Sequence, residues 1–309
     1  MHSTLGDRRL KCFFKAVELG SIRAAADELL LEPSLVSRQI MQLEAELGAT
    51  LLERRGRGVH PTPSGNVVME HCHDRWGLEH GLREKLNDLS GLRRGELRIA
   101  ISEGFLDEFI ERVLNPFSEC YPQVVIHIIL QTASEVVRMV ATDEAHLGVT
   151  LHAQRDNRVR ILADCPHPLF AIVGPSHSLS TCRRPLSLAD LAEWPLVLAP
   201  VGSGLRSLID SAAFVERIEV EPRFVANSVR ALKAIAATNN AVTFLPKISV
   251  QPELNQASLF ALPNSNPILQ SARAQVFVRR GRTYSSALSA LVSVMGERRY
   301  FSTSPLKGR

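Results

Sequence analysis

The chain has 309 residues, of which 45% are hydrophobic and 22% are charged, and its formal net charge at pH 7 is +4. This length allows more than one domain with a buried core, and the small net charge excludes a protein that coats polyanions with its whole surface. The chain has no signal-peptide pattern and no apolar run near the roughly 18 residues of a membrane span. We therefore expect a cytoplasmic protein with no membrane contact.

Two short helices are predicted near the N-terminus. Along the first, apolar residues recur at steps of three and four, which places them on one face: Leu10, Phe13, Phe14 and Val17. Ser21 can cap the second helix, in which the small side chains of Ala24–Ala26 let two helices cross closely. Such a close crossing is typical of a helix-turn-helix.

A third helix is predicted from Pro33 to Gly48. Proline suits its first turn because the missing N–H is not needed there, and glycine commonly ends a helix. A stripe of apolar residues is expected to be buried: Val36, Ile40, Leu43 and Leu47. The spacing therefore predicts an amphipathic helix of about four turns.

The opposite face of this third helix carries Ser34, Ser37, Arg38 and Gln39. Arginine can donate two hydrogen bonds to guanine, glutamine can pair with adenine, and hydroxyls can reach phosphates or base edges. These side chains suit the major groove of duplex DNA. Periodicity alone also allows a helical subdomain whose polar face is only solvated.

An ordered series of motifs surrounds these helices. It consists of Gly20-Ser21-Ile22-Arg23-Ala24-Ala25, Pro33-Ser34-Leu35-Val36-Ser37-Arg38-Gln39-Ile40, Leu43-Glu44, Leu47-Gly48, Leu51-Leu52-Glu53-Arg54 and Thr62-Pro63-Ser64-Gly65. The series resembles the DNA-binding domain of LysR-type transcriptional regulators, and the rest of the chain is similar to that family in length and pattern. The resemblance implies a winged helix-turn-helix over residues 5–62.

The resemblance also implies which side chains meet DNA. The recognition helix would present Ser34, Ser37, Arg38 and Gln39, with Arg38 as the strongest single candidate. Arg54 and Arg55 in the wing would face phosphates or the minor groove, and the alternative is a basic loop that is only solvated.

Two residues depart from the family pattern. Ile22 stands where the family usually has Phe, and this is a change in packing. Glu32 stands where the family usually has Gln before the proline, which puts one polar contact near the recognition helix in doubt and can alter the half-site preference.

A long helix is predicted over residues 63–90, as a linker and dimerisation element. Four leucines along it form a short coiled-coil seam: Leu78, Leu82, Leu86 and Leu89. A two-fold dimer would present two recognition helices to half-sites one helical turn apart or a multiple of it. The alternative is a long helix that packs on its own domain.

The chain after residue 90 has a different pattern. Residues 91–95 contain two glycines and two arginines, which indicates a hinge. Strand and helix patterns then alternate from residue 96 to residue 300, starting with strands at Leu97–Ile101, Val124–Leu130 and Leu147–Leu151, and residues 301–309 form a tail. This alternation predicts parallel βαβ units in an α/β domain.

The α/β region resembles the two-lobed effector domain of the same regulators, which looks like a periplasmic solute-binding protein. The predicted fold class is therefore α plus α/β. His146 replaces the family's usual Asp, and Asn239-Asn240 replaces a turn that contains Gly, so local geometry is expected to differ there.

Ligands of open α/β sheets lie beyond the carboxyl ends of the strands, where helix N-termini offer free N–H groups. This rule selects eight candidate effector-binding residues: Ser102, Glu103, Thr132, Ser134, Gly202, Ser203, Asn227 and Ser228. Helix starts with hydroxyl groups favour a small anion such as an organic carboxylate, whereas Glu103 would favour a cationic or hydroxylated ligand. Each residue is also an ordinary helix cap, and Thr132 with Glu135 can form a capping box.

The cysteines and histidines indicate no cofactor. The five cysteines are odd in number and lack metal-type spacing, so buried thiols are expected in a reducing compartment. The resemblance to LysR-type regulators adds, as an alternative, a redox role for Cys165 and Cys182. On a helix, few side chains of His71-Cys72-His73-Asp74 can converge on one ion. We predict no metal site and no catalytic residues, because the chain lacks the common hydrolase, P-loop, dinucleotide and zinc-protease motifs.

The functional prediction is a sequence-specific DNA-binding transcriptional regulator under the control of a small-molecule effector. Its predicted partners are double-stranded DNA with dyad-symmetric promoter sites, the effector and further copies of the chain in a homodimer or homotetramer, with RNA polymerase as an additional candidate. The alternative is a solute-binding or enzymatic α/β protein whose N-terminal helices serve only dimerisation.

Overall fold

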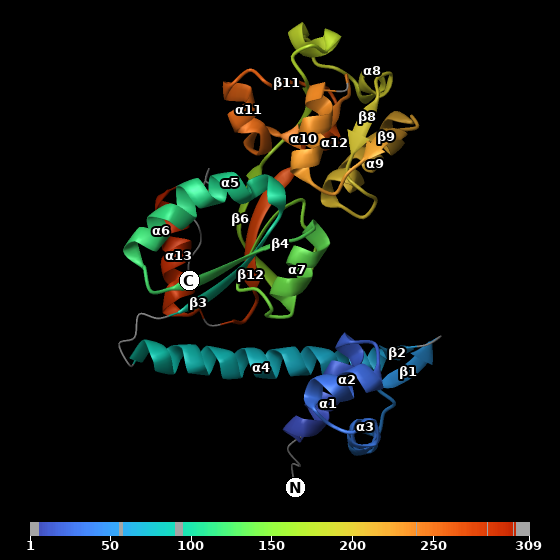
Figure 1. Cartoon of the computed structure of the whole chain (residues 1–309), viewed down its shortest axis with the longest axis vertical. Helices are drawn as coiled ribbons and strands as arrows, with labels where there is room; N and C mark the ends of the chain where they lie inside the picture. The colour runs from blue at the N-terminus through green and yellow to red at the C-terminus, as the bar shows by residue number, and fades with distance from the viewer. Residues whose placement is uncertain are drawn as a thin grey trace. The chain divides into compact units, whose positions relative to one another are not determined.

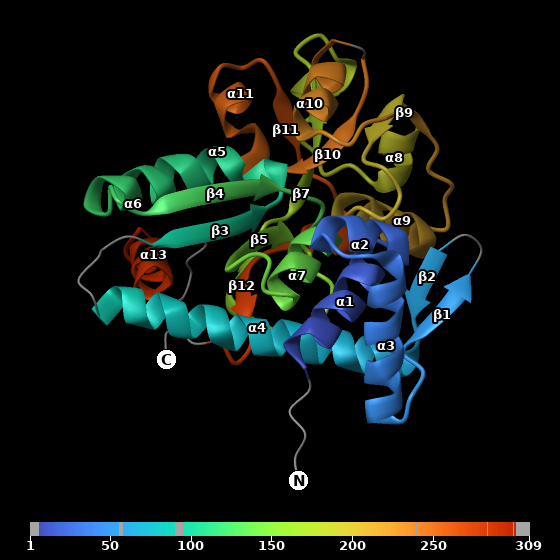
Figure 2. The same ribbon diagram turned by 60° about the horizontal axis from the view of Figure 1, so that its bottom comes forward.

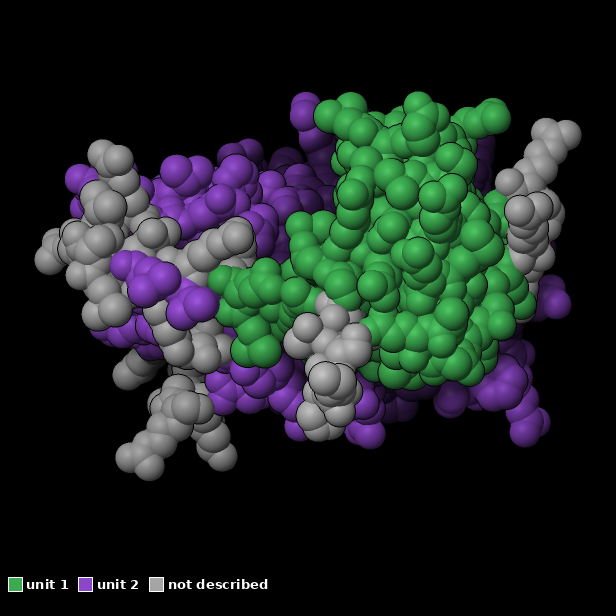
Figure 3. Space-filling view, turned by 90° about the horizontal axis from the view of Figure 1, so that it is seen from below, with its two compact units in different colours: residues 1–80 green, residues 81–309 purple. Residues whose placement is uncertain are grey.

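The computed structural model describes residues 6–55, 58–89, 95–238, 240–282, 284–298 and 300. The chain divides into two units, residues 1–80 and residues 81–309, which are green and purple in Figure 3. Of the predicted hinge at residues 91–95, only Gly95 is among the described residues, and the predicted tail at 301–309 lies outside them.

The first unit is a winged helix-turn-helix, as predicted (Figures 1 and 2). In chain order its elements are α1 (Asp7–Glu18), α2 (Ile22–Leu29), α3 (Pro33–Leu47), β1 (Leu52–Arg55), β2 (Gly58–Pro61) and the start of the long helix α4 (Pro63–Leu89). The strands β1 and β2 pair antiparallel, with Leu52 opposite Pro61, and form the wing.

Local signals set the ends of these helices. The hydroxyl of Ser21 accepts a hydrogen bond from the N–H of Ala24 at 3.3 Å and caps α2, and Pro33 lies in the first turn of α3. Gly48 ends α3 with a φ of 64°, a conformation that glycine adopts without steric cost. The predicted buried stripe of α3 is correct as far as Leu43, but Leu47 in the last turn is 38% exposed.

The core of the first unit joins all of its helices. Buried side chains from α1, α2 and α3 meet around Phe13, and each large one contributes about 1.5–3 kcal/mol through the removal of apolar surface from water. The wing joins this core through Val59, whose N–H donates to the carbonyl of Gly20 at 3.0 Å. The wing is therefore tied to the turn between α1 and α2.

The start of α4 also packs against α1. The ring of Phe14 makes edge-on contacts with Trp76 and His73, at centroid distances of 4.8 and 5.0 Å. Cys72 is fully buried beside them, and burial raises the pKa of its thiol to about 12. The beginning of the linker helix is therefore part of the core of the first unit.

The second unit has two lobes, and the first lobe is built on a five-stranded sheet. Its strands, in spatial order, are β4 (Val125–Leu130), β3 (Glu96–Ile101), β5 (Leu147–Leu151), β12 (Arg273–Arg279) and β6 (Val159–Pro166). The predicted parallel pairing of the first three strands is confirmed. β12, however, runs antiparallel to both β5 and β6, because it enters this lobe on the return of the chain from the second lobe.

Helices cover both faces of this sheet (Figures 1 and 2). α7 (Ala133–Ala141) packs through its valines on one face. On the other side a helical stretch contributes Phe109 and Phe117 to a core that also contains side chains of α13 (Ser286–Glu297). That stretch consists of α5 (Leu106–Phe109), a π-helical turn at Ile110–Leu114 and α6 (Asn115–Cys120). Because helices cover both faces of the sheet, both faces of its central strands are buried, and this explains why their sequences are almost entirely apolar.

The second lobe is a smaller sheet with short helices. β7 (Leu169–Val173) pairs antiparallel with β10 (Thr243–Pro246) and β11 (Phe260–Leu262). β8 (Leu196–Leu198) pairs parallel with β9 (Pro222–Val225), and its Leu196 forms a single parallel bridge with Val242, the residue just before β10. The helices of this lobe are α8 (Leu188–Ala192), α9 (Gly204–Glu216), α10 (Val229–Thr238), α11 (Gln251–Asn255) and α12 (Pro267–Gln270).

The chain crosses between the two lobes twice. It leaves the first lobe after β6 and returns to it before β12. Of the Asn239-Asn240 turn in the second lobe, only Asn240 is described, and its φ of 46° is a left-handed conformation that asparagine tolerates better than most residues. This explains how asparagine can stand in a turn where a glycine is more usual.

Candidate functional site

The polar face of α3 is open to solvent in the first unit. Ser34 and Arg38 are exposed one turn apart, and Ser37 and Gln39 beside them are half-buried. The amide of Gln39 lies 3.5 Å from that of Gln42, and the exposed Met41 and Gln42 continue the same surface for another turn. The sequence reasoning stopped at Gln39, although the helical period extends to Gln42.

The wing is fixed to the end of α3 by one carboxylate. Oε1 of Glu44 accepts hydrogen bonds from the backbone N–H groups of Leu51 and Leu52, at 2.7 and 3.2 Å. The strand β1 contains the backbone of Arg54 and Arg55, while their side chains lie outside the described residues. Glu44 therefore sets where the wing begins relative to α3.

The Thr-Pro-Ser-Gly motif forms the junction between the wing and α4. The hydroxyl of Thr62 donates to the carbonyl of Thr50 at 2.7 Å and accepts from the N–H of Gly65 at 3.0 Å. A Cβ atom on Gly65 would lie 2.1 Å from the carbonyl oxygen of Leu51, so only glycine fits at this position. The motif therefore caps α4 and holds its first turn against the wing.

The leucine row of α4 is exposed in the single chain. Leu78, Leu82 and Leu86 are 72%, 58% and 56% exposed, and the side chain of Leu89 lies outside the described residues. The steps between these leucines are four, four and three residues, which keeps the row on one side of the helix. An apolar row of this kind favours a partner helix.

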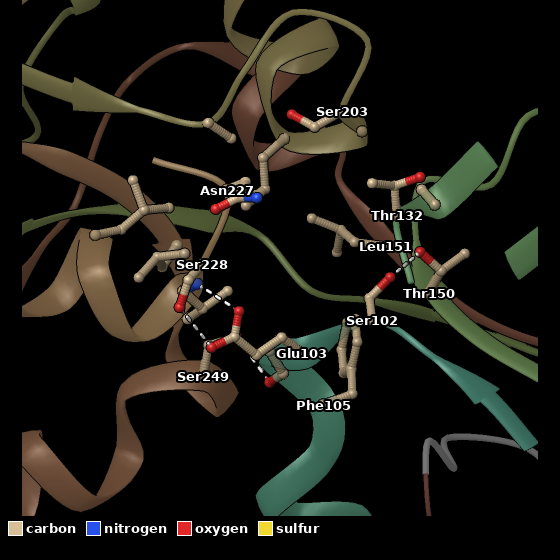
Figure 4. Close-up of a pocket in the computed structure, with 18 of the residues that line it drawn as sticks. Ser102, Glu103, Phe105, Thr132, Thr150, Leu151, Ser203, Asn227, Ser228 and Ser249 are labelled. Carbon is tan, nitrogen blue, oxygen red and sulfur yellow. Dashed lines mark hydrogen bonds between the residues drawn. The ribbon is translucent and has the colours of Figure 1, made fainter. Parts of the chain in front are cut away.

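A cavity of about 300 Å³ lies between the two lobes of the second unit (Figure 4). Six of the eight sequence-predicted effector residues line it: Ser102, Glu103, Thr132, Ser203, Asn227 and Ser228. The other two do not. The exposed Ser134 lies with its hydroxyl 3.3 Å from that of Thr132, and the exposed Gly202 forms the turn ahead of α9 with a φ of 88°.

The cavity lies at the carboxyl ends of β3 and β5, as the rule for open sheets predicts. The hydroxyls of Ser102 and Thr150 are 2.6 Å apart at this edge (Figure 4). Thr150, Ser249 and Phe105 also line the cavity and were not predicted. A signal for Thr150 was present, because it is the one hydroxyl residue in the apolar strand Leu147–Leu151.

The helix starts around the cavity are capped in different ways. Ser203 caps α9 by accepting from the N–H of Arg206 at 3.2 Å, as expected of an N-cap serine. The capping box expected from Thr132 and Glu135 is wrong, because the Thr132 side chain makes no capping hydrogen bond and Glu135 pairs with Arg138. The start of α7 thus lacks a side-chain cap.

The start of α10 is occupied by a side chain of the first lobe. The carboxylate of Glu103 accepts hydrogen bonds from the N–H of Val229 at 2.7 Å and from the hydroxyl of Ser228 at 2.9 Å. It also accepts from the N–H of Arg230 at 3.2 Å. The expectation that this helix start offers free donors to a ligand is therefore wrong, since the protein's own carboxylate takes them.

Other candidate groups stay apart in the structure. Neither Cys165 nor Cys182 is part of a disulfide, and the first is buried while the second is half-buried. Within the described ranges, no three His, Cys, Asp or Glu side chains are placed so that they could hold a metal ion. No helix in the described part of the chain is long and apolar enough to cross a membrane.

Two family models match the chain along most of its length. Residues 8–66 match the model of the bacterial regulatory helix-turn-helix protein of the lysR family. Residues 90–299 match the model of the LysR substrate binding domain. The two matches coincide with the winged helix-turn-helix and the two-lobed unit.

Curated relatives and solved structures agree with these models. The SDS degradation transcriptional activation protein of a Pseudomonas species is 30% identical over 294 residues, which cover 92% of this chain and 93% of that protein. The RuBisCO operon transcriptional regulator of Allochromatium vinosum is 31% identical over 210 residues, 68% of each chain.

Among solved structures, a variant of full-length OxyR from Pseudomonas aeruginosa is 17% identical with a TM-score of 0.66, over 96% of this chain and 95% of that one. Full-length CbnR in complex with its target DNA is 21% identical with a TM-score of 0.60, over 96% of this chain and 100% of the CbnR chain. The regulatory domain of Synechocystis CcmR in complex with 2-PG is 20% identical with a TM-score of 0.59, over 67% of this chain and 98% of the CcmR domain. These structures share the fold of the chain.

Family models that match most of the chain and a relative that is 30% identical over nearly its whole length together establish the family. The chain belongs to the LysR family of DNA-binding transcriptional regulators.

Proposed function

We propose that this regulator binds dyad-symmetric promoter DNA through α3 and the wing, as a homodimer or homotetramer, and that a small molecule in the interlobe cavity controls it. The observation that carries the DNA contact is the exposed row of Ser34 and Arg38 opposite the buried face of α3. The similarity to CbnR, whose structure contains target DNA, supports this assignment. The chain would act in the cytoplasm, without catalysis.

The roles of the side chains follow from their chemistry. Arg38 would donate two hydrogen bonds to a guanine edge, and the hydroxyls of Ser34 and Ser37 would reach phosphates or bases. Gln39 would read an adjacent base, and Arg54 and Arg55 would approach the backbone from the wing. DNA affinity should fall steeply as salt increases, because phosphate contacts release counterions.

Selection of genomic DNA fragments by the purified full-length protein tests the DNA contact. The wild type should enrich fragments that share a dyad-symmetric site, and Arg38→Ala should enrich none at the same salt. Arg183→Ala is the matched control, because it removes an exposed arginine from the second lobe and should retain the enrichment. Failure of the folded wild type to enrich any sequence would favour a solute-binding or enzymatic protein instead.

The exposed leucine row supports the dimer. Leu82→Asp places a charge in the middle of this row and should shift the protein toward monomers in sedimentation velocity, with loss of DNA affinity. Leu30→Asp places the same charge on a leucine that is 92% exposed and lies outside the row, and it should leave the oligomer intact. Equal dissociation of both variants would contradict an α4 seam.

The cavity supports control by an effector. It opens between two lobes that the chain connects at two crossings, so a ligand can bias the relative arrangement of the lobes. The related CcmR domain was solved with 2-PG, which supports a small-molecule role for this kind of domain. An effector should raise the melting temperature of the wild type and lose this effect in Thr150→Val, which removes a hydroxyl that lines the cavity.

A further inference from the structure

Glu103 belongs to one lobe and its hydrogen-bonding partners belong to the other. It follows β3 in the first lobe, whereas Ser228, Val229 and Arg230 form the start of α10 in the second lobe. Both oxygens of its carboxylate accept hydrogen bonds. Oε1 accepts from Ser228 (Figure 4) and from Arg230, and Oε2 accepts from Val229. The carboxylate therefore fills the position in which a bound anion would meet the helix start.

The same corner of the cavity is closely packed. The hydroxyl of Ser249 donates to the carbonyl of Gly104 at 2.9 Å, and a Cβ on Gly104 would lie 2.6 Å from that hydroxyl oxygen. Gly104 directly follows Glu103 in the chain. The backbone of the first lobe is thus held against the second lobe beside the carboxylate.

The rest of the cavity offers no positive charge. Among the described residues that line it, Glu103 is the one charged side chain, and no lysine, arginine or histidine is present. The remaining polar groups are hydroxyls and amides, including those of Ser102, Thr150 and Asn227, set among apolar side chains such as Leu151 and Leu245. A buried carboxylate that has neither a cationic partner nor the donors of a helix start is strongly unfavourable in such surroundings.

We propose that Glu103 determines the specificity of the effector cavity. It occupies the start of α10 with a carboxylate of the chain itself, so this helix start is closed to carboxylate ligands. The negative charge of Glu103 in the cavity then favours small uncharged molecules that carry hydroxyl or amide groups on an apolar body. This inference rests on the proposed role of the cavity as the effector site. It replaces the expected organic carboxylate with a neutral ligand class.

Chemical rescue of a Glu103 variant tests this proposal. Glu103→Ala removes the carboxylate and leaves the α10 donors open to a small anion from solution. Thermal melting of the full-length protein is measured in sodium acetate, in sodium chloride at equal ionic strength, and in chloride with acetamide. Acetate should raise the melting temperature of Glu103→Ala by about 3 °C, while acetamide has no such effect and the wild type changes by less than about 1 °C.

Two further variants sharpen the test. Glu135→Ala removes a carboxylate that pairs with Arg138 on α7 and does not line the cavity, so acetate should not stabilise it more than chloride does. Glu103→Ser also vacates the site, and it should show the same acetate rescue if Glu103→Ala does not fold. Stabilisation of the wild type by acetate, equal rescue by acetamide, or no rescue of either Glu103 variant would each overturn the proposal.

This test is independent of DNA binding. If acetate rescues Glu103→Ala but the wild type selects no DNA sequence, the occupation of the α10 start is correct and the proposed regulatory role fails. If DNA selection succeeds but acetate has no selective effect, the regulatory role remains and the inference about Glu103 fails.

Discussion

The carboxylate of Glu44 accepts a hydrogen bond from the backbone N–H of Leu51, with 2.7 Å between the oxygen and the nitrogen. The same oxygen accepts from the next N–H along the chain, so a side chain near the end of α3 satisfies two backbone donors at the start of the wing. Glu44 and Leu51 thereby connect the two elements expected to meet DNA.

Removal of this carboxylate should loosen the wing. Glu44→Ala leaves two partly buried N–H groups without their acceptor, which should cost about 2 kcal/mol of the stability of the first unit. Glu44→Gln keeps one acceptor oxygen and should cost less. Trp76 fluorescence during urea unfolding reports on this unit in a Trp194→Phe background, because the chain has two tryptophans. Equal stability of Glu44→Ala and the wild type would contradict this role.

A methyl group at Gly65 should destabilise the same junction. Its Cβ would lie 2.1 Å from the Leu51 carbonyl oxygen, so backbone must move, and we expect Gly65→Ala to cost about 3 kcal/mol. Gly81→Ala is the matched control in α4, because nothing lies within 4 Å of its Cβ, and it should stabilise the helix by about 0.5–1 kcal/mol. Circular dichroism melting distinguishes the opposite signs.

Leu30 ends α2 in a conformation that favours glycine. Its φ of 54° is left-handed, and its side chain is 92% exposed, so few contacts depend on it. Leu30→Gly should raise the stability of the first unit by about 0.5 kcal/mol. It removes the steric cost of a left-handed leucine, and this gain is partly offset because glycine loses more conformational entropy on folding. Leu29→Gly, inside the helix, should lower it by about 1 kcal/mol or more. Urea unfolding followed by Trp76 fluorescence measures both changes.

Glu32 places an exposed carboxylate at the N-cap of α3, beside the proposed DNA surface. Because this charge would repel phosphates, Glu32→Gln should tighten DNA binding about three-fold in low salt, and the gain should shrink as salt screens it. Fluorescence anisotropy with a selected operator fragment measures this, with Glu193→Gln on the second lobe as the control. An affinity gain that is the same at all salt concentrations would rule out electrostatic repulsion.

Burial of Cys72 should make stability depend on alkaline pH. Burial raises the pKa of this thiol to about 12, so below pH 9 the thiol is protonated in both the folded and the unfolded protein. Above pH 9 the unfolded thiol ionises first, and its contribution to stability is lost as the pH rises toward 12. Between pH 8 and pH 10 the wild type should lose about 1 kcal/mol more than Cys72→Ala does, measured by urea unfolding.

Much of the first unit was predictable because its signals are local. Ser21 caps α2 by accepting a hydrogen bond from the N–H of Ala24, only three residues away. Pro33 and Gly48 mark the two ends of α3, and its buried stripe follows from a helical period of 3.6 residues. The position of Leu47 was not predictable in this way, because its exposure depends on where neighbouring elements end. The antiparallel direction of β12 was not predictable for a similar reason, since strand direction depends on the path of the chain between the lobes.

The sequence alone determined the residue types at the strand ends and helix starts, and its resemblance to the LysR family implied that they meet in a cleft between two lobes. Only the tertiary structure decided how these groups are used. Glu103 and Val229 are far apart in the chain, and hydrogen bonding between them needs both lobes in place. Helix capping depends on neighbours a few residues away. The charge of a cleft, and whether its hydrogen-bond donors are already used by the protein, depend on side chains that folding brings together.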